Sequence, residues 1–495
     1  MKSRISSILL ILASMTVSCQ RGQELYDPQS YDDLTGHVVC LLEGSAHTVY
    51  ADKYLKDKGI TFTLFPSISD CMLAVRQNKA DMFFGADMNA YTDAFREQHL
   101  RISHIVPDLD LPVGFGVSKE NTLLKEQCNH YLDSISRNGG LKEISDRWIN
   151  PDNTDFHDVI RIDPIPAEPK NADKVLRLGI AGVKHPTEVL IDNKWTGMEI
   201  ELAQRIAERY GYSIQIKVYD FNNLIPAIQS GKADLIAATI MISEERLEKI
   251  DFTTPHALLR GAFFVADKLP DDRGSIFSRI ARSFETSFIK ENRWKLIFQG
   301  LWTTLFITVL SLIGGFILGG LICRMRMSGN ALTVRIAKLY LYFMRNIPIL
   351  VLLMLMFYVV FARSGMDAIW VAIIAFSMNT SAFFCETFHT GIRAVDKGQT
   401  EAGRAMGCSA FKTFIYIVMP QAARISMPVF KNECITLLKG TSVVGYISII
   451  DITKASDLIR SSTFEAFLPL ITITIFYFIM ASIITTLLDR LMKRL

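Results

Sequence analysis

The chain has 495 residues, a formal net charge of +3 at pH 7 and a hydrophobic fraction of 49%. This length argues against a single domain. So small a net charge, without a cluster of basic residues, argues against a nucleic-acid partner. Residues 20–295 read as water-soluble, whereas long apolar runs dominate from Leu296 onward. We therefore expect a soluble part followed by a membrane part.

Residues 1–19 have the pattern of an export signal. Lys2 and Arg4 precede an apolar run, residues 5–18, that is too short to span a bilayer. The run ends in Thr16-Val17-Ser18-Cys19, which resembles a loose bacterial lipobox with Thr16 where Leu is usual. That resemblance implies a lipid on Cys19. An ordinary signal sequence or an uncleaved anchor is the alternative.

Two soluble segments alternate short apolar strands with helices. Residues 34–150 contain HVVCLLEGSA, ITFTLF and ADMFFGAD, and residues 174–268 contain KVLRLGIAGV, YSIQIKVYDF and ADLIAATI. Strands separated by helices that open on polar residues and close at glycine predict parallel α/β lobes. Residues 151–173 contain four prolines and predict a semi-extended linker. A second linker, residues 269–295, leads to the membrane part.

Five apolar segments predict five membrane helices, at residues 296–323, 346–362, 368–385, 414–430 and 466–488; only the fourth contains a charged side chain, Arg424. Arginines and lysines are enriched in the loop after the first segment, in the loop after the third, and after the last. The positive-inside rule places these regions in the cytoplasm. Because the number of spans is odd, everything before Leu296 would then lie outside, as the export signal also predicts.

A motif lies between the third and fourth predicted spans. Residues 401–420 read EAGRAMGCSAFKTFIYIVMP and keep Glu401, Ala402, Gly407, Ile417 and Pro420 at the spacing E-A-A-x3-G-x9-I-x-L-P. Gly403 and Met419 depart from that pattern. The motif resembles the cytoplasmic coupling loop of ABC importer permeases, which implies a short helix docked into a groove on a separate ATP-hydrolysing subunit. An ordinary amphipathic connector is the alternative.

Other segments resemble the permeases of polar amino-acid importers, so that the resemblance covers residues 295–490. They include GLWTTLFITV, KGQTEAG and LLKGTSVV. Glu386, in AFFCETFHTGI, occupies the position of the acidic residue in the A-E-I-x-R-G-G-I pattern of the same family. A charge within a membrane helix is costly unless it faces a cavity or a partner. Glu386 is therefore a candidate for the translocation path, with an interhelical ion pair as the alternative.

The soluble segments resemble an amino-acid-binding protein of the Venus-flytrap kind, with its lobes in reversed order. Residues 174–268 look like its first lobe and residues 34–150 like its second, including the closing GGLKEISDRW. We infer one bilobal domain that is circularly permuted at a crossing between the lobes. The original termini of the family would then be joined by residues 151–173, which is feasible because domain termini often lie close together. Two half-domains that each pair with a partner chain are the alternative, but these would expose their interlobe faces.

The resemblance implies six candidate ligand-binding residues. Arg246, in SEERLEKIDF, falls on the family's arginine for the ligand carboxylate, a role for which a planar guanidinium is suited. The other five are Ser243, Phe221, Ser45, Ala46 and Asp87; a gapless alignment puts Ala86, not Asp87, at the family's ammonium-binding aspartate. Thr187, Met241 and Leu42 replace more polar or aromatic family residues, so we expect a less polar cleft. A surface ion pair for Arg246 and a core role for Phe221 are the alternatives.

The sequence contains no G-x4-G-K-[ST] phosphate loop and no metal-ligand spacing. We therefore expect no cofactor, no metal and no ATP hydrolysis by this chain alone. The expected partners are a cytoplasmic ABC ATPase, a second permease copy in a homodimer or heterodimer, an amino-acid ligand and the bacterial inner membrane. The sequence thus predicts the membrane subunit of an ATP-driven amino-acid importer with its own receptor. A ligand-binding membrane sensor or a ligand-gated channel is the alternative.

The expected architecture is an α/β bilobal domain, like a periplasmic binding protein, followed by an all-α transmembrane domain of five helices at residues 296–490.

Overall fold

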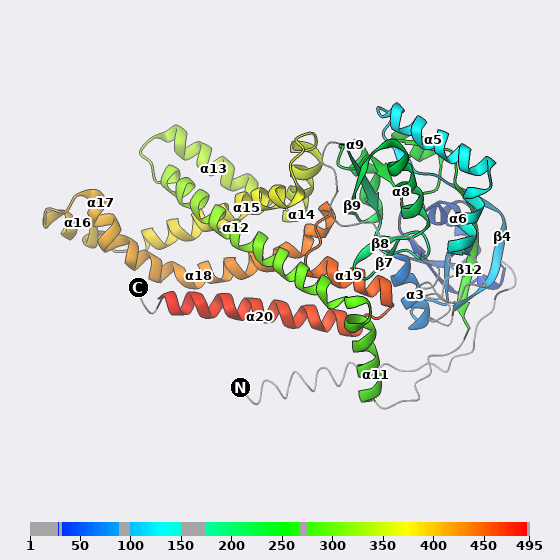
Figure 1. Ribbon diagram of the computed structural model, residues 1–495. Helices are drawn as coiled ribbons and strands as arrows, with labels where there is room; N and C mark the ends of the chain where they lie inside the picture. Colours follow the sequence, from blue (N-terminus) through cyan, green and yellow to red (C-terminus); the bar gives the residue numbers. More distant parts are fainter. Residues whose placement is uncertain (1–27, 29–31, 89–99, 150–173, 268–275, 493–495) are drawn as a thin grey trace.

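The computed structural model describes residues 28, 32–88, 100–149, 174–267 and 276–492. The predicted signal segment with Cys19 and the linker 151–173 lie outside these residues, and the linker 269–295 is described only from residue 276. A mixed α/β domain lies at one end of the molecule, and long helices extend away from it (Figure 1). Both parts predicted from the sequence are therefore present.

The first sheet of the α/β domain has five strands in the order β2-β1-β3-β12-β4. Strands β1, β2 and β3 run parallel, whereas β12 pairs antiparallel with β3 and β4. Buried rings hold β3 against β12: Phe84 stacks on Phe263 with 4.4 Å between ring centroids. This lobe is called the first lobe from here on, by its place in the chain, although most of it falls in the segment that resembles the second lobe of the family. Its elements are η1 (Asp32–Leu34), β1 (Val38–Leu42), α2 (Ala46–Tyr54), η2 (Lys56–Lys58), β2 (Thr61–Phe65), α3 (Ile68–Arg76), β3 (Met82–Ala86), β4 (Leu100–Val113) and β12 (Ala257–Ala266).

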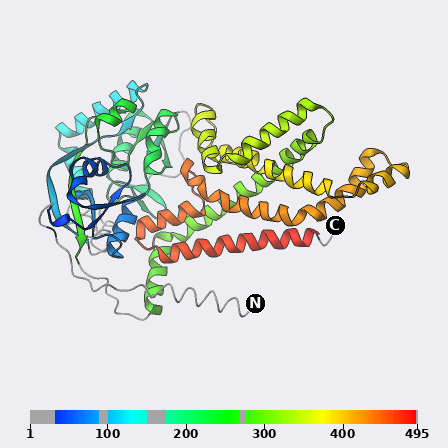
Figure 2. The same cartoon turned by 180° about the vertical axis from the view of Figure 1, so that it is seen from behind.

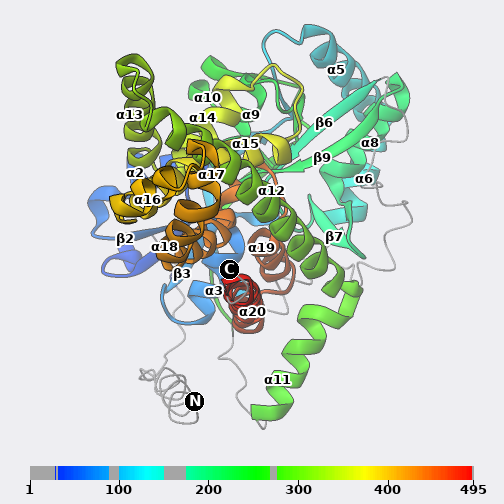
Figure 3. The same ribbon diagram turned by 90° about the vertical axis from the view of Figure 1, so that its left-hand side faces the viewer.

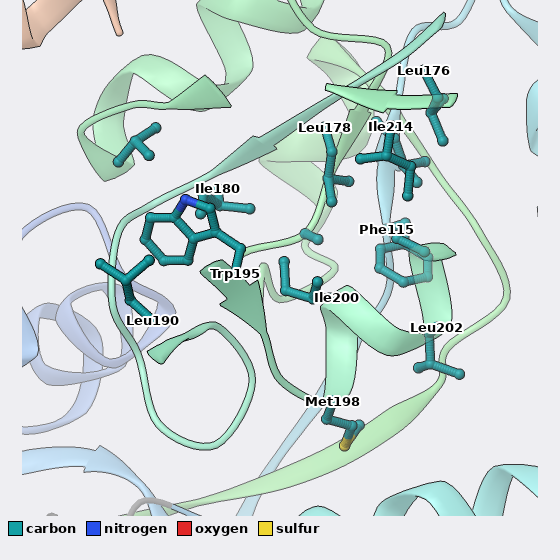
Figure 4. Packing of buried hydrophobic residues seen from close by; sticks show 14 of the residues in the cluster. Phe115, Leu176, Leu178, Ile180, Leu190, Trp195, Met198, Ile200, Leu202 and Ile214 are labelled. Atoms are coloured by element: carbon teal, nitrogen blue, oxygen red, sulfur yellow. The ribbon is translucent and has the colours of Figure 1, made fainter. Parts of the chain in front are cut away.

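The second sheet has the strand order β11-β5-β10-β6-β9. Its buried aliphatic side chains, among them Leu178 and Ile180, pack with Phe115, Met198 and Trp195 (Figure 4). The elements of this lobe are β5 (Gly116–Val117), α5 (Thr122–Arg137), α6 (Gly140–Ile149), β6 (Val175–Ile180), β7 (Val189–Ile191), β8 (Lys194–Thr196), α8 (Met198–Tyr210), β9 (Ser213–Val218), η4 (Phe221–Asn223), α9 (Leu224–Gln229), β10 (Leu235–Ile236), α10 (Glu244–Lys249) and β11 (Asp251–Phe252).

The two sheets divide the chain differently from the predicted lobes, 34–150 and 174–268. Strand β5 pairs antiparallel with β10 and β11 and so belongs to the second sheet, and the helices α5 and α6 that follow it pack into the core of the same lobe. Strand β12 belongs to the first sheet. The Trp148 indole also donates to Glu201 on α8 at 2.7 Å. Each sheet thus contains segments from both halves of the soluble sequence, and the chain passes between the two sheets at residues 113–116 and 252–257.

The helical part contains three single helices long and apolar enough to cross a membrane, among the described residues: α12 (Trp294–Arg326), α15 (Ala368–Arg393) and α20 (Phe467–Met492). Two helix pairs pass the same test together but are bent, residues 331–360 by 106° and residues 410–463 by 53°. The number of spans is therefore three, or up to five if each bent pair is one span. The other elements are α11 (Ile276–Phe284), η5 (Glu285–Ile289), η6 (Lys290–Asn292), α13 (Ala331–Asn346), α14 (Ile349–Leu355), η7 (Met356–Val360), α16 (Lys397–Ala405), α17 (Ala410–Thr413), η8 (Phe414–Val418), α18 (Met419–Gly440), η9 (Thr441–Ile447) and α19 (Ile452–Thr463).

Small side chains let α12 and α15 approach closely. A Cβ atom added at Gly319 would lie 2.8 Å from the Cβ of Phe384 and 2.9 Å from the Ser381 carbonyl, and one added at Gly315 would lie 3.1 Å from Thr380. Glycines four residues apart form such close-packed helix interfaces in membranes, where burial of apolar surface gives little drive for association. Viewed nearly along α20, α11 extends sideways from this bundle (Figure 3).

The receptor lobes rest directly on the helical part, and α19 contacts both of them. Lys454 donates to Asp220 of the second lobe at 2.7 Å, and Arg460 pairs with Asp70 on α3 of the first lobe. Apolar residues of α19, including Ile452 and Ile459, belong to the same buried cluster as Leu178 and Trp195 of the receptor. The two parts therefore share a hydrophobic core, and one helix contacts both lobes.

Candidate functional site

A cleft lies between the two sheets and draws its lining from both lobes. The first lobe contributes the turn after β1, the start of α2, Ile68 and the end of β3, and the second contributes the loops after β6, β9 and β10 and the start of α10. The lining residues are Leu42, Ser45, Ala46, His47, Ile68, Phe83, Phe84, Gly85, Ala86, Lys184, Phe221, Thr239, Met241 and Arg246. Four of the six predicted ligand residues, Arg246, Phe221, Ser45 and Ala46, therefore meet here.

Arg246 joins the two lobes. Its Nη1 donates to the Met241 carbonyl at 2.8 Å, and its Nη2 donates to the Gly44 carbonyl, across the cleft, also at 2.8 Å. The guanidinium carbon lies 5.6 Å from the centroid of the Phe221 ring, a cation–π arrangement. Burial lowers the pKa of Arg246, yet an arginine keeps its charge at neutral pH. The alternative expected for this residue was a surface pair with Glu244, Glu245 or Glu248. In the described structure the guanidinium instead bonds two backbone carbonyls, and Glu245 acts on it only through its charge.

The lobes approach closely beside Arg246. A Cβ atom at Gly44 would lie 2.2 Å from the Asn222 Oδ1 atom of the opposite lobe, at the end of a side chain that can turn away. Gly44 also has a φ of 70°, in the left-handed region, and this backbone conformation favours glycine. Ser45, the next residue, caps α2: its Oγ accepts from the Thr48 amide at 3.3 Å. The loop predicted to face a ligand carboxylate thus lies at a helix N-terminus, where backbone amides favour anions.

Two predicted ligand residues do not line the cleft. Asp87 lies next to Ala86, which does line it, and the Asp87 carboxylate accepts from the Arg260 side chain at 2.9 Å and the Arg260 amide at 3.1 Å. Ser243 is the residue before α10 and makes no side-chain capping bond. Since Asp87 already has a cationic partner, it is not placed to bind a ligand ammonium.

Three polar lining residues were missed by the sequence reasoning: His47, Lys184 and Thr239. His47 follows the predicted Ala46 directly, and Lys184 and Thr239 follow strands β6 and β10 of the parallel sheet. The carboxyl ends of parallel strands commonly carry ligand-binding residues, and this rule could have identified the last two.

A buried polar cluster lies behind Lys184 and Thr239. Thr239 has a φ of 48°, in the left-handed region, and its amide donates to Glu199 at 2.8 Å. Glu199 also bonds His256 at 2.9 Å. Burial opposes ionisation of Glu199, but these hydrogen bonds outweigh it and lower its pKa. Glu188, buried beside that charge, has its pKa raised well above the ordinary value.

The predicted coupling loop lies at the end of the molecule opposite the receptor (Figures 1 and 2). Glu401 and Ala402 are exposed on α16, Ile417 lies in η8, and Pro420 lies in the first turn of α18. Gly407 connects α16 to α17 with a φ of 82°. Apolar side chains of this hairpin are strongly exposed, with Met406 at 72%, Phe411 at 74% and Tyr416 at 75%. Such a cluster at the tip of a hairpin marks an interaction site.

Gly403, the departure from the coupling motif, has a packing explanation. A Cβ atom there would lie 2.7 Å from the Ile417 side chain and 2.8 Å from the Thr413 methyl group. Gly403 therefore lets α16 pack closely on the segment that carries Ile417. A methyl group at position 403 would push against two neighbours in a well-packed contact.

Glu386 is held by two arginines from neighbouring helices. Its carboxylate bonds Arg326 of α12 at 2.5 Å and Arg345 of α13 at 3.5 Å. Lys431 pairs in the same manner with Asp489 of α20. The interhelical ion pair, which was the alternative to a place in the translocation path, is thus present for Glu386.

Comparisons with known proteins identify both parts of the chain. The model of the family described as bacterial extracellular solute-binding proteins, family 3, matches residues 176–407, beginning at β6. The chain is 31% identical over 206 residues to the probable glutamine ABC transporter permease protein GlnM of Bacillus subtilis, a match that covers 41% of this chain and 95% of that protein. It is 33% identical over 189 residues to the probable amino-acid ABC transporter permease protein YckA of Bacillus subtilis, covering 38% and 83%.

Similar matches extend to other transport systems. The chain is 34% identical over 174 residues to the nopaline transport system permease protein NocM of Agrobacterium fabrum, covering 33% of this chain and 72% of that protein. A solved structure of an amino acid ABC transporter with histidines is matched at 31% identity over 45% of this chain and 99% of that chain, with a TM-score of 0.38. The three relatives named here, GlnM, YckA and NocM, are all permease proteins.

Proposed function

Because the chain belongs to the permease family of amino-acid ABC transporters and carries a solute-binding domain on the same polypeptide, we propose that it captures amino acids or related solutes with its own receptor and passes them to its own pore. The chain is a transport subunit and not an enzyme, and ATP hydrolysis resides on a separate ABC ATPase. The main support is the arrangement of the cleft and the coupling loop at opposite ends of one chain, with α19 in contact with both receptor lobes.

The proposed mechanism begins with ligand binding between the lobes. Arg246 binds the ligand carboxylate, the loop at Ser45 and Ala46 presents amides from the opposite lobe, and the lobes are held together. Lys454 and Arg460 transmit the position of each lobe to α19. ATP binding in the partner acts on residues 401–420 and switches the pore between outward-facing and inward-facing states. Ligand binding at one end of the chain and ATP binding at the other both shift the equilibrium between these two states.

We also infer that the receptor is a circularly permuted flytrap. The family match begins at β6, in the middle of the domain, while the strands β1 to β5 precede it in the chain. Both sheets need strands from each half of the soluble sequence, which favours a single permuted domain over two half-domains completed by a partner.

We propose five membrane spans, with the receptor outside and the coupling loop inside. Each bent helix pair then counts as one span. Cys408 offers a test, because it is half-exposed in the coupling loop while the other free cysteines of the described residues are buried. A membrane-impermeant maleimide should label Cys408 only in permeabilised cells, with Cys408→Ser as the control. A cysteine at the exposed Lys56 of the receptor should be labelled in intact cells, and the reverse pattern would contradict this orientation.

The expected partners are a cytoplasmic ABC ATPase and a second permease copy, in a homodimer or a heterodimer. The exposed apolar cluster at Met406, Phe411 and Tyr416 supports a docked ATPase. A sensor or a ligand-gated channel would need no such coupling loop, and nothing observed favours either.

ATP hydrolysis tests the proposal. The full chain is reconstituted in nanodiscs with an ABC ATPase of the same organism, and the rate is measured with and without ligand. We expect stimulation by ligand that Glu401→Lys abolishes and that a matched change at the exposed Glu120 of the receptor leaves intact. Ligand binding without any effect on ATP hydrolysis would favour the sensor.

A further inference from the structure

The cleft carries positive charge but no carboxylate. Among its described lining residues, Arg246 and Lys184 are cations, and none is aspartate or glutamate. A zwitterionic amino acid brings an ammonium group with three donors as well as a carboxylate. A buried ammonium is costly unless it is paired with an acid or with several acceptors.

Three acids beside the cleft lining are engaged in contacts within the protein. Asp87 is bound to Arg260, by both the guanidinium and the amide. Glu199 is bound to His256 and the Thr239 amide, and Glu188 accepts from the Thr187 hydroxyl at 2.8 Å. These three carboxyl groups complete contacts within the protein and do not line the space between the lobes.

The carbonyls and the aromatic ring beside the cations are also engaged. The carbonyls of Met241 and Gly44 accept from Arg246, and the Ala238 carbonyl accepts from Lys184 at 3.5 Å. The Phe221 ring, which could otherwise attract an ammonium, has the Arg246 guanidinium over it. An incoming ammonium would therefore compete with two protein cations for these groups.

The cleft contains a neutral acceptor that has no partner in the described structure, on His47. His47 is 4% exposed, and its Nε2 has no hydrogen-bond partner in the described structure. The ring also hydrogen-bonds the backbone of Gly85, and burial, with the nearby Lys184 charge, lowers the pKa of His47 to about 3. A neutral ring that donates to a carbonyl through its other nitrogen presents Nε2 as an acceptor. A ligand hydroxyl can satisfy this atom without adding charge.

We propose, on the basis of the function proposed above, that the cleft binds a small carboxylate that carries a hydroxyl rather than an ammonium group. Arg246 and Lys184 hold the negative charge, and His47 Nε2 accepts a hydrogen bond from the ligand hydroxyl. The apolar side chains of Leu42, Ile68 and Met241 leave room for an aliphatic substituent. The preferred ligands are thus hydroxy acids related to amino acids.

Matched ligand triplets test this proposal. Calorimetry on the full chain in nanodiscs compares an amino acid, its 2-hydroxy analogue and its unsubstituted analogue: alanine, lactate and propanoate; leucine, 2-hydroxy-4-methylpentanoate and 4-methylpentanoate; glutamate, 2-hydroxyglutarate and glutarate. At least one hydroxy acid should bind about tenfold or more tightly than its amino acid, because an unpaired buried ammonium is disfavoured. Equal or tighter binding of the amino acids, or no binding of any hydroxy acid, would overturn the proposal.

Two substitutions sharpen the test. Ala86→Asp adds an acid to the lining and should shift the preference by about tenfold or more towards the amino acid, whereas the isosteric Ala86→Asn should not. His47→Phe should abolish the preference for the hydroxy acid over the unsubstituted acid. If the hydroxy preference survives in His47→Phe, the role of His47 is wrong.

The failure of this proposal can be distinguished from the failure of the importer function. If amino acids bind best and stimulate ATP hydrolysis in the reconstituted complex, the importer stands and the hydroxy-acid preference is overturned. If a hydroxy acid binds as expected but never stimulates ATP hydrolysis, the ligand class stands and the importer is contradicted.

Discussion

The cleft and the coupling loop differ in how their residues are assembled. The loop comes from one continuous segment, residues 401–420, and leaves its apolar side chains exposed. The cleft collects its lining from seven or more separate turns and strand ends, and most of its polar groups contact other protein groups. A docking loop can therefore be recognised from a short motif, whereas the chemistry of a cleft depends on single residues far apart in the sequence.

The largest effect should follow from Arg246→Ala. This change removes the cation for the ligand carboxylate and the bond to Gly44 that joins the lobes. We expect ligand affinity to fall by about 100-fold, in the range found for truncation of one partner in a buried charge pair. Calorimetry on the full chain measures this, with Arg205→Ala on α8 as a matched control. An unchanged affinity would exclude Arg246 from the site.

Replacement of Phe411 or Tyr416 by aspartate should prevent ligand binding in the cleft from stimulating ATP hydrolysis in the partner. Both side chains are strongly exposed in the coupling loop, and a buried aromatic anchor often dominates an interface. Ligand-stimulated ATP hydrolysis should fall by about tenfold or more, with ligand affinity unchanged. Val49→Asp, at an exposed site on α2, is the control. A loss of ligand affinity in the Phe411 or Tyr416 variants would show that the loop acts on the receptor instead.

Breaking the contacts of α19 should have a smaller effect on the same readout. Arg460→Ala removes the pair with Asp70, and Lys454→Ala removes the pair with Asp220. We expect each to reduce ligand stimulation by several-fold, since a half-buried ion pair contributes modestly. The charge-swapped pair Asp70→Arg with Arg460→Asp should restore part of the loss. Stimulation that is insensitive to both changes would mean that α19 does not report lobe position.

The last effect concerns stability and leaves transport itself untouched. Burial lowers the pKa of His47 from an ordinary value of 6.5 to about 3, so between these values the unfolded chain binds a proton that the folded chain does not. The free energy of unfolding therefore rises with pH across this interval and falls on acidification below pH 6.5, by on the order of 2 kcal/mol at pH 5. His47→Phe should make the unfolding temperature less sensitive to pH between 7 and 5. An identical pH dependence in wild type and variant would contradict the neutral, buried state.

The parts of the fold that depend on local patterns were predictable. The coupling loop, the apolar helices and the α/β character of the receptor all follow from residues close together in the sequence. The sheets divide the chain differently from the predicted segments 34–150 and 174–268, because β5 has only two residues and β12 pairs with strands far earlier in the chain. Asp87 does not line the cleft, whereas its neighbour Ala86 does, and the Asp87 carboxylate is bonded to Arg260 instead.

The polar chemistry of the cleft was predicted less completely. His47 and Lys184 resemble ordinary surface residues in sequence, and only the packing of the lobes brings them together. The expected less polar cleft holds for Leu42 and Met241 but not for these two side chains. The charge of a site depends on which acids already form ion pairs with other residues of the protein, as Asp87 does with Arg260. These partners lie far apart in the sequence, so the sequence near the site does not reveal them.

Uptake into vesicles tests the central claim most directly. Proteoliposomes that contain this chain and its ABC ATPase, and no separate binding protein, are supplied with ATP and with a radiolabelled ligand identified by calorimetry. If the receptor and the pore of one chain work together, uptake will require ATP, saturate with ligand and disappear in Arg246→Ala. Uptake that appears only when a separate soluble binding protein is added, and that is unaffected by Arg246→Ala, would contradict the claim.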